Sequence, residues 1–298
     1  MNVIEIEQLT KRYGRRVGIH NLSLCVEAGT LFGFLGPNGS GKTTTIRVLL
    51  GLLKADAGFA RVFGQDCWQA SHRVKAEVGY LPGDLRLYPW LTCTSALRIA
   101  GQTRRRDLTK SCLELADLFG LEPDVRVSRM SRGMRQKLGL ILALAHRPRV
   151  LILDEPTAAL DPLVQETLFR VLRERSQEGC TVFFSSHTLS EVERLCDRVA
   201  ILREGRLVAH ETLSALRSRA GRAVTILWRS DIDPRNITPP PVLQVHQKEG
   251  LQWHATLTGS ATEFIRWSVA QPIEDLSIGQ PDLNRLFQRY YTSPEQDA

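Results

Sequence analysis

The sequence lacks any long run of apolar residues. Its longest run, residues 138–145, is far shorter than the roughly 18 apolar residues that a membrane-spanning helix needs. The first residues, Met1 to Glu5, also lack the basic and apolar regions of a secretory signal peptide. We therefore expect the chain to stay in the cytoplasm.

Closely spaced cysteine pairs are absent as well. No two of the cysteines form a Cys-x-x-Cys pair, and they are scattered along the chain at Cys25, Cys67, Cys93, Cys112, Cys180 and Cys196. This pattern argues against a zinc site or a disulfide framework. Buried, reduced thiols are the expectation. The sequence also contains no internal repeat.

Basic residues outnumber acidic residues in the first part of the chain. The net charge is +7, but residues 231–298 hold five Lys or Arg against nine Asp or Glu, so the positive excess lies in residues 1–230. Such an excess suits nucleic acid or the anionic inner face of a membrane. The densest basic patch, Arg104 to Arg106, is more typical of a solvated loop than of a binding site.

A glycine-rich stretch at residues 36–43 fits the pattern Gly, four residues, Gly-Lys-Ser/Thr. An apolar run at 31–35 predicts a buried strand before it, and the helical spacing of residues 44–51 predicts a helix after it. Strand, glycine-rich loop and helix form the context of a phosphate-binding loop. The candidate nucleotide-binding residues are Gly36, Pro37, Asn38, Gly39, Ser40, Gly41, Lys42, Thr43 and Thr44.

These residue types explain how the loop would bind a phosphate. Glycines let successive backbone N–H groups point into one concavity at a helix N-terminus, where the helix dipole favours an anion. Lys42 would reach the β- and γ-phosphates, and the Thr43 hydroxyl would coordinate Mg²⁺. The sequence therefore predicts nucleotide binding.

Two carboxylates and a histidine follow buried strands further along the chain. Asp154 and Glu155 follow the apolar run 150–153, and His187 lies just past the apolar run 181–184. Asp154 would hold Mg²⁺, and Glu155 would orient and deprotonate an attacking water. A neutral His187 could donate to the γ-phosphate and keep the water in line. The expected catalytic residues are Lys42, Glu155 and His187.

The order of the expected elements predicts an α/β fold with two domains. Residues 1–216 would form a phosphate-loop core with a mixed sheet, N-terminal antiparallel strands and a helical subdomain at about 85–146. Residues 217–298 would form a small α+β domain that ends in a helix at 281–291. A proline-rich loop at 231–241 and several short strand-like runs set this part apart.

The same motifs resemble the nucleotide-binding subunits of ATP-binding-cassette (ABC) transporters over residues 1 to about 215. The matching motifs are the Walker A loop at 36–43, Walker B at 150–155, the D-loop at Ala159-Leu160-Asp161, the switch histidine His187, the adenine-stacking Tyr13, and the signature at Ser131-Arg132-Gly133-Met134-Arg135-Gln136. The resemblance implies ATP and Mg²⁺ as ligands, and signature residues that complete the ATP site of a second copy. Ser131 can cap the following helix and aim its N–H groups at a phosphate.

Two positions depart from the family pattern. Arg132 replaces the first glycine of the signature, in a form that resembles the subgroup which partners type-2 permeases, mostly exporters. Gly83 stands where the family has the glutamine of the Q-loop, so either Asp84 supplies an oxygen ligand in its place or the role is lost. Tyr88 and Trp90, just beyond, are equally compatible with a permease contact and with the core of the helical subdomain.

The resemblance implies an ATPase that energises an ABC transporter, with an exporter as the expected direction. Its expected partners are a separate transmembrane permease and a second copy of the chain, which would place the protein on the inner face of the cell membrane. The rival interpretation is a soluble ABC ATPase that acts on ribosomes or nucleic acid. One cassette and no heptad run argue against that rival, and we expect no nucleic-acid partner. A regulator that does not hydrolyse ATP is a third interpretation, which rests on Gly83 alone.

Overall fold

The computed structural model describes residues 1–14, 16–281, 283 and 287, and it divides into two compact units. The first unit is Met1–Glu211 and the second is Thr212–Ala298. The division lies a few residues before the boundary at 216 that the sequence predicts. Among the described residues, no helix is both long and apolar enough to cross a membrane.

A six-stranded sheet forms the centre of the first unit, in the order β10-β9-β3-β8-β7-β6. Strands β3, β7 and β8 are buried along their whole length, as their uninterrupted apolar runs predict for parallel strands covered on both faces. The strands are β3 (Leu31–Leu35), β6 (Val78–Leu81), β7 (Val150–Asp154), β8 (Thr181–Ser186), β9 (Arg198–Arg203) and β10 (Arg206–Thr212).

A four-stranded antiparallel sheet, in the order β2-β1-β4-β5, belongs to the same unit. Helix α1 (Lys42–Leu49) contacts both sheets, and its buried residues Ile46 and Leu49 share one apolar core with Ile4 and Phe34. The strands of this sheet are β1 (Asn2–Tyr13), β2 (Arg16–Glu27), β4 (Ala57–Val62) and β5 (Gln65–Asp66).

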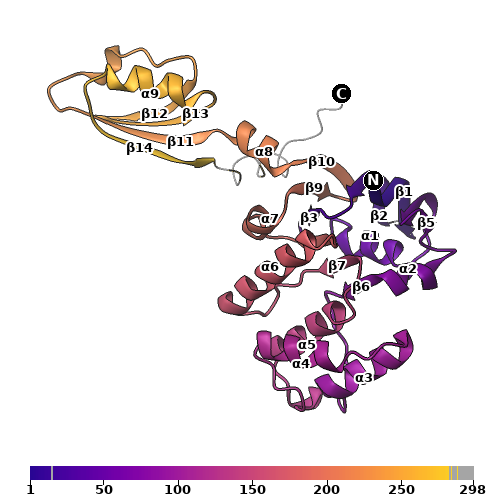
Figure 1. Cartoon of the computed structure of the whole chain (residues 1–298). Helices are drawn as coiled ribbons and strands as arrows, with labels where there is room; N and C mark the ends of the chain where they lie inside the picture. The colour runs from indigo at the N-terminus through magenta and orange to yellow at the C-terminus, as the bar shows by residue number, and fades with distance from the viewer. Residues whose placement is uncertain (15, 282, 284–286, 288–298) are drawn as a thin grey trace. The chain divides into compact units, whose positions relative to one another are not determined.

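Helices cover the central sheet and form a separate group at one end of the unit. Helices α6 (Pro162–Gln177) and α7 (Leu189–Leu195) pack on β3 and β8, on the side away from α1 and α2 (Ser71–Glu77) (Figure 1). The helical group occupies the expected region, and its members lie together in Figure 1. They are α3 (Cys93–Arg104), α4 (Thr109–Leu118), the short 3₁₀ helix η1 (Val127–Arg129) and α5 (Arg132–Leu144).

The second unit contains an antiparallel sheet, in the order β12-β13-β11-β14, and helix α9 packs against it (Figure 1). Its core is aromatic, since Trp228, Trp253 and Phe264 are fully buried. The elements are α8 (Leu213–Ala220), β11 (Arg222–Trp228), η2 (Pro234–Asn236), β12 (Leu243–Glu249), β13 (Gln252–Leu257), α9 (Ala261–Val269) and β14 (Ile273–Pro281).

Some elements differ from the sequence-based expectation. The sequence pattern predicts no element for residues 57–77, where the structure has β4, β5 and α2. Strand β4 buries only Ala60 and Val62, and α2 buries only Val74, so neither has a clear periodic apolar face. The helix expected at 281–291 falls almost wholly outside the described residues.

Candidate functional site

Three neighbouring parallel strands end at the same edge of the central sheet. In the pairing register, Leu35 of β3 lies opposite Ser186 of β8, and Asp154 of β7 lies opposite Ser185 of β8. The phosphate loop, the two carboxylates and His187 follow these strand ends directly. The topology therefore brings together residues that are more than a hundred positions apart in the sequence.

The phosphate loop needs glycine for reasons that its geometry shows. Gly41 has a φ of +106°, and a Cβ there would lie 2.5 Å from the backbone oxygen of Gly18. A Cβ at Gly36 would lie 2.6 Å from the backbone oxygen of Leu202. Gly41 is also the N-cap of α1 and offers no side-chain cap. The first N–H groups of α1 therefore have no side-chain acceptor at the cap, which suits an anion at this helix end.

Lys42 is buried in this loop, with 5% of its surface exposed. Its Nζ donates to the backbone oxygens of Gly36 at 2.7 Å and Pro37 at 3.2 Å, and it lies 3.5 Å from Oε1 of Glu155. Burial lowers the pKa of Lys42, against the opposite effect of the Glu155 carboxylate. The lysine therefore sits at the loop with its charge only partly compensated.

Thr43 and Asp154 lie in direct contact. The Thr43 hydroxyl donates to Oδ2 of Asp154 at 2.8 Å, and the Ser185 hydroxyl donates to Oδ1 of Asp154 at 2.6 Å. Asp154 is almost fully buried, and Thr44 follows Thr43 in the first turn of α1. The two oxygen-bearing residues expected at a magnesium ion are thus adjacent, while Ser185 is a residue that the motifs did not identify.

Glu155 lies between Lys42 and His187. Its Oε2 is 3.4 Å from Nδ1 of His187, whose side chain is half exposed. The backbone of Glu155 has a φ of +50°, in the left-handed region that residues other than glycine seldom adopt. Its N–H donates to both the hydroxyl and the backbone oxygen of Ser185. This backbone turn directs the carboxylate toward the phosphate loop.

Tyr13, the expected adenine-stacking residue, lies at the end of β1 with 44% of its surface exposed. Its ring lies against Gly18, where a Cβ would approach the ring to 2.9 Å, and the oxygen of Gly18 borders Gly41. The segment before Tyr13 is fixed by Asp56, whose carboxylate accepts from the backbone N–H of Arg12 at 2.7 Å. A partly exposed aromatic ring is therefore held beside the phosphate loop.

The signature residues begin helix α5, as expected. Ser131 is the N-cap, and its hydroxyl accepts from the backbone N–H of Met134 at 3.2 Å. A Cβ at Gly133 would lie 2.8 Å from the backbone oxygen of Ala159. Ser131 and Arg132 are exposed, so the start of α5 is open to a partner.

Asp161 and Gln136 have local structural partners. The Asp161 carboxylate caps α6 by accepting from the backbone N–H of Val164 at 3.0 Å. The buried side chain of Gln136 donates to the backbone oxygen of Pro156 at 3.0 Å, which links α5 to the segment after Glu155.

Asp84, the candidate further metal ligand, faces solvent. Its side chain is 74% exposed, and its carboxylate lies 3.0 Å from the guanidinium of Arg86. Gly83 lies beside the carboxylate of Asp154, since a Cβ there would be 3.4 Å from Oδ2. At the position of the Q-loop glutamine, this chain therefore has no side chain that could reach toward Asp154.

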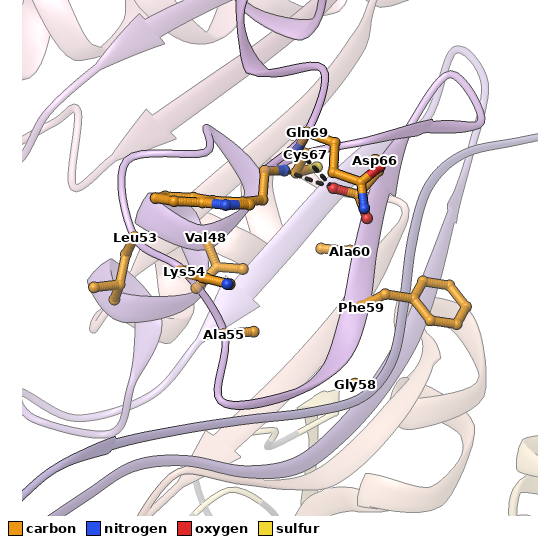
Figure 2. A pocket seen from close by; sticks show the side chains of 11 residues that line it. Val48, Leu53, Lys54, Ala55, Gly58, Phe59, Ala60, Asp66, Cys67 and Gln69 are labelled. Carbon is orange, nitrogen blue, oxygen red and sulfur yellow. Dashed lines mark hydrogen bonds between the residues drawn. The ribbon is translucent and has the colours of Figure 1, made fainter.

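Two hollows lie away from these residues. One, of about 140 Å³, opens between the end of α1 and β4 and is lined by Lys54, Phe59 and Cys67 among others (Figure 2). Burial raises the pKa of the Cys67 thiol to about 12, which disfavours the nucleophilic thiolate form. The other, of about 470 Å³, lies at the basic patch, where Arg104 donates to the backbone oxygen of Ala76 at the end of α2. Neither hollow holds the residues that the motifs identify.

Comparison with known proteins agrees with the motifs. The model of the ABC transporter family matches residues 19–158. The chain is 36% identical to the bacitracin transport ATP-binding protein BcrA of Bacillus licheniformis over 73% of this chain and 72% of that protein. It is 38% identical to the Nod factor export ATP-binding protein I of Paraburkholderia xenovorans over 72% of each chain.

A solved structure shows the same fold. The ATP-binding subunit of an ABC transporter superposes with a TM-score of 0.68 at 28% identity, over 72% of this chain and 92% of that one. The sequence matches, this structural match and the assembled phosphate loop, carboxylates and histidine lead to one conclusion: the chain belongs to the ABC transporter family, as an ATP-binding subunit that hydrolyses ATP to energise transport.

Proposed function

We propose that this chain energises an exporter by closing as an ATP-bound dimer against a membrane permease. The observation that carries the proposal is the position of the Glu155 carboxylate at the phosphate loop. One of its oxygens lies 3.5 Å from Nζ of Lys42, and the other lies 3.4 Å from Nδ1 of His187. The direction of transport is supported by the relatives, of which one is a bacitracin transport protein and another a Nod factor export protein.

Binding of ATP would exchange the contacts of Lys42. Its ammonium group now donates to two loop carbonyls, and the phosphates of ATP offer stronger, charged acceptors at the same place. The free N–H groups at the start of α1 add further donors, and Tyr13 supplies a ring on which adenine can stack. The chain's own residues thus account for both ends of the nucleotide.

Mg²⁺ fits the oxygen atoms of Thr43 and Asp154, which would hold it while it neutralises phosphate charge. Among the described residues, no group of three or more His, Cys, Asp or Glu side chains is placed to hold a metal. This fits a magnesium ion that takes only one or two protein ligands and completes its shell with phosphates and water.

Hydrolysis would be assigned to Glu155 and His187. The Glu155 carboxylate is 28% exposed, so it can reach a water at the loop edge and accept its proton. His187 lies on the far side of that carboxylate from Lys42 and would keep the base and the γ-phosphate aligned. The exposed position of His187 leaves it free to contact a bound ligand.

The second half of the ATP site would come from a second copy of the chain. The capped N-terminus of α5 is exposed at Ser131 and Arg132. Such a helix end attracts an anion, and a second copy in head-to-tail orientation would present it with a γ-phosphate. Because one chain carries both a phosphate loop and a signature turn, a homodimer suffices.

The permease contact would lie beyond the phosphate loop, at the exposed aromatic pair Tyr88 and Trp90. These side chains are 68% and 59% exposed, and their rings stack with centroids 6.0 Å apart. Exposed stacked aromatic rings are typical of protein–protein contacts and not of a subdomain core. Association with the permease would hold the protein at the inner face of the membrane.

The decisive experiment is the substitution Glu155→Gln, which keeps the shape of the side chain but removes its basicity. We expect ATP binding to persist while hydrolysis falls by about 10²- to 10⁴-fold, the range for loss of a general base. The variant should also accumulate as an ATP-bound dimer in size-exclusion chromatography. Wild-type turnover in this variant would show that Glu155 is not the base.

A further inference from the structure

The hydroxyl of Ser185 contacts both acidic residues of the proposed site. We propose that Ser185 is a positioning residue for ATP hydrolysis, which orients the Asp154 carboxylate and fixes the backbone of Glu155. The inference rests on the proposed function of those two residues. None of the motifs includes Ser185, because a serine inside a buried strand carries no signal of its own.

The contacts of Ser185 are short and enclosed. The side chain is fully buried at the end of β8, opposite Asp154 in the register of the parallel strands. Its hydroxyl donates to Oδ1 of Asp154 at 2.6 Å and accepts from the N–H of Glu155 at 3.1 Å. A hydrogen bond to a carboxylate in a water-excluded place is strong, so one oxygen atom ties both residues to β8.

The Asp154 carboxylate has few other constraints. Thr43 donates to Oδ2, but Thr43 is also an expected ligand of the magnesium ion. Gly83, on another side of the carboxylate, has no side chain to hold it. Ser185 is therefore the donor that can keep the carboxylate oriented when Thr43 turns to another partner.

The backbone of Glu155 needs support as well. Its φ of +50° is seldom adopted by residues other than glycine, and such a conformation persists where the surroundings determine it. Two oxygen atoms of Ser185, the hydroxyl and the carbonyl, accept from the same N–H of Glu155. Loss of the hydroxyl would leave the carbonyl at 3.2 Å alone in holding this turn.

The neighbouring serine shows that the arrangement is specific. Ser186 is equally buried, but its hydroxyl contacts Glu191 and the backbone of Thr188, not the acidic pair. Burial at this strand end therefore does not by itself direct a hydroxyl to Asp154.

Three variants of the whole chain distinguish a positioning role of Ser185 from a role in packing alone. Ser185→Ala removes the hydroxyl, and Ser185→Cys fills nearly the same space with a much weaker donor. Thr181→Val is the matched control, since it removes another buried hydroxyl of β8. That hydroxyl accepts a hydrogen bond from the N–H of Gly29, at the opposite end of the strand.

Both Ser185 variants should lower kcat about 10- to 100-fold and raise the Mg²⁺ concentration for half-maximal hydrolysis by about tenfold, the range for loss of a residue that orients a metal ligand. In the nucleotide-free protein, hydrogen exchange should be faster in the peptides that contain the backbone amide of Glu155. The Kd for ATP in the presence of EDTA should stay unchanged, and Thr181→Val should match the wild type in all four measurements.

Several results would overturn the inference. A Ser185→Cys variant that matches the wild type in kcat, Mg²⁺ dependence and exchange would show that the residue only fills space, whatever Ser185→Ala does. Equal losses in Thr181→Val would show a general effect of removing a buried hydroxyl. If the wild-type protein hydrolyses no ATP, the proposed function fails, while the exchange measurement still tests the role of Ser185.

Discussion

At the scale of residues, Glu155 shares its two carboxylate oxygens between a buried cation and a half-exposed imidazole. The buried ammonium of Lys42 is already satisfied by loop carbonyls, each contact contributing on the order of 1 kcal/mol net. In the proposed mechanism, a phosphate would replace these contacts of Lys42. Glu155 would then be free of its contact with Lys42, as its proposed role as a base requires.

Asp84 is expected to contribute little to Mg²⁺ binding. Its carboxylate is exposed and paired with Arg86, and an exposed pair of this kind contributes at most about 1 kcal/mol. We expect Asp84→Asn to leave the Mg²⁺ concentration for half-maximal hydrolysis within about twofold of wild type. Titration of ATPase activity with Mg²⁺ measures this, with Asp154→Asn as the positive control.

A tenfold rise in that concentration for Asp84→Asn would contradict the prediction. It would mean that Asp84 leaves Arg86 and supplies the oxygen ligand that the glutamine supplies in related proteins. The unchanged result would mean instead that the role of the glutamine is lost at Gly83.

At the scale of elements, the strands that carry the site are predictable because their residues are buried on both faces. The apolar runs at 31–35, 150–153 and 181–184 fall within β3, β7 and β8, and the motifs lie at the ends of these strands. Neither β4 nor α2 is predictable in this way, since each buries only one or two side chains. In these five elements, a clear sequence pattern accompanies extensive burial.

The same distinction explains which site residues the sequence predicts. Lys42, Thr43, Asp154 and Glu155 belong to patterns with fixed spacing, so the sequence alone identifies them. The contact of Ser185 with Asp154 depends on the register of two strands that are far apart in the chain. The packing of Gly18 beneath Tyr13 likewise depends on a hairpin and not on spacing. Such contacts arise from tertiary structure.

The substitution Gly133→Ala tests the role of the first turn of helix α5. The new Cβ would lie 2.8 Å from the backbone oxygen of Ala159, so the start of α5 or the D-loop must shift. Alanine favours the helix by about 1 kcal/mol over glycine, which offsets part of that cost in stability. We expect ATP binding to remain, but hydrolysis to fall at least about tenfold because the displaced turn fits a second copy poorly.

Measurements of nucleotide affinity, turnover and thermal unfolding on the same preparation test this expectation. Wild-type turnover in Gly133→Ala would show that this turn of α5 does not take part in the hydrolytic site. A loss of ATP binding in the single chain would show that the shift reaches the phosphate loop directly.

At the scale of the whole molecule, the net charge belongs to the first unit. Residues 212–298 hold nine Lys or Arg and nine Asp or Glu, so the second unit has no net charge and the +7 lies in residues 1–211. Each unit has a core of its own, built around Phe34 and Ile46 in the first and around Trp228 and Trp253 in the second. A unit with its own core can in principle fold alone.

We therefore expect a fragment of residues 1–211 to fold and to bind ATP with a Kd within about threefold of the full chain, because the phosphate loop, both carboxylates and His187 all lie within it. Far-ultraviolet circular dichroism with thermal unfolding measures the fold, and fluorescence titration with a labelled nucleotide measures the affinity. A fragment of residues 1–216 controls for the cut at the end of β10. If both fragments fold but bind ATP much more weakly than the full chain, the second unit contributes to the nucleotide site, and the two units are not independent in function.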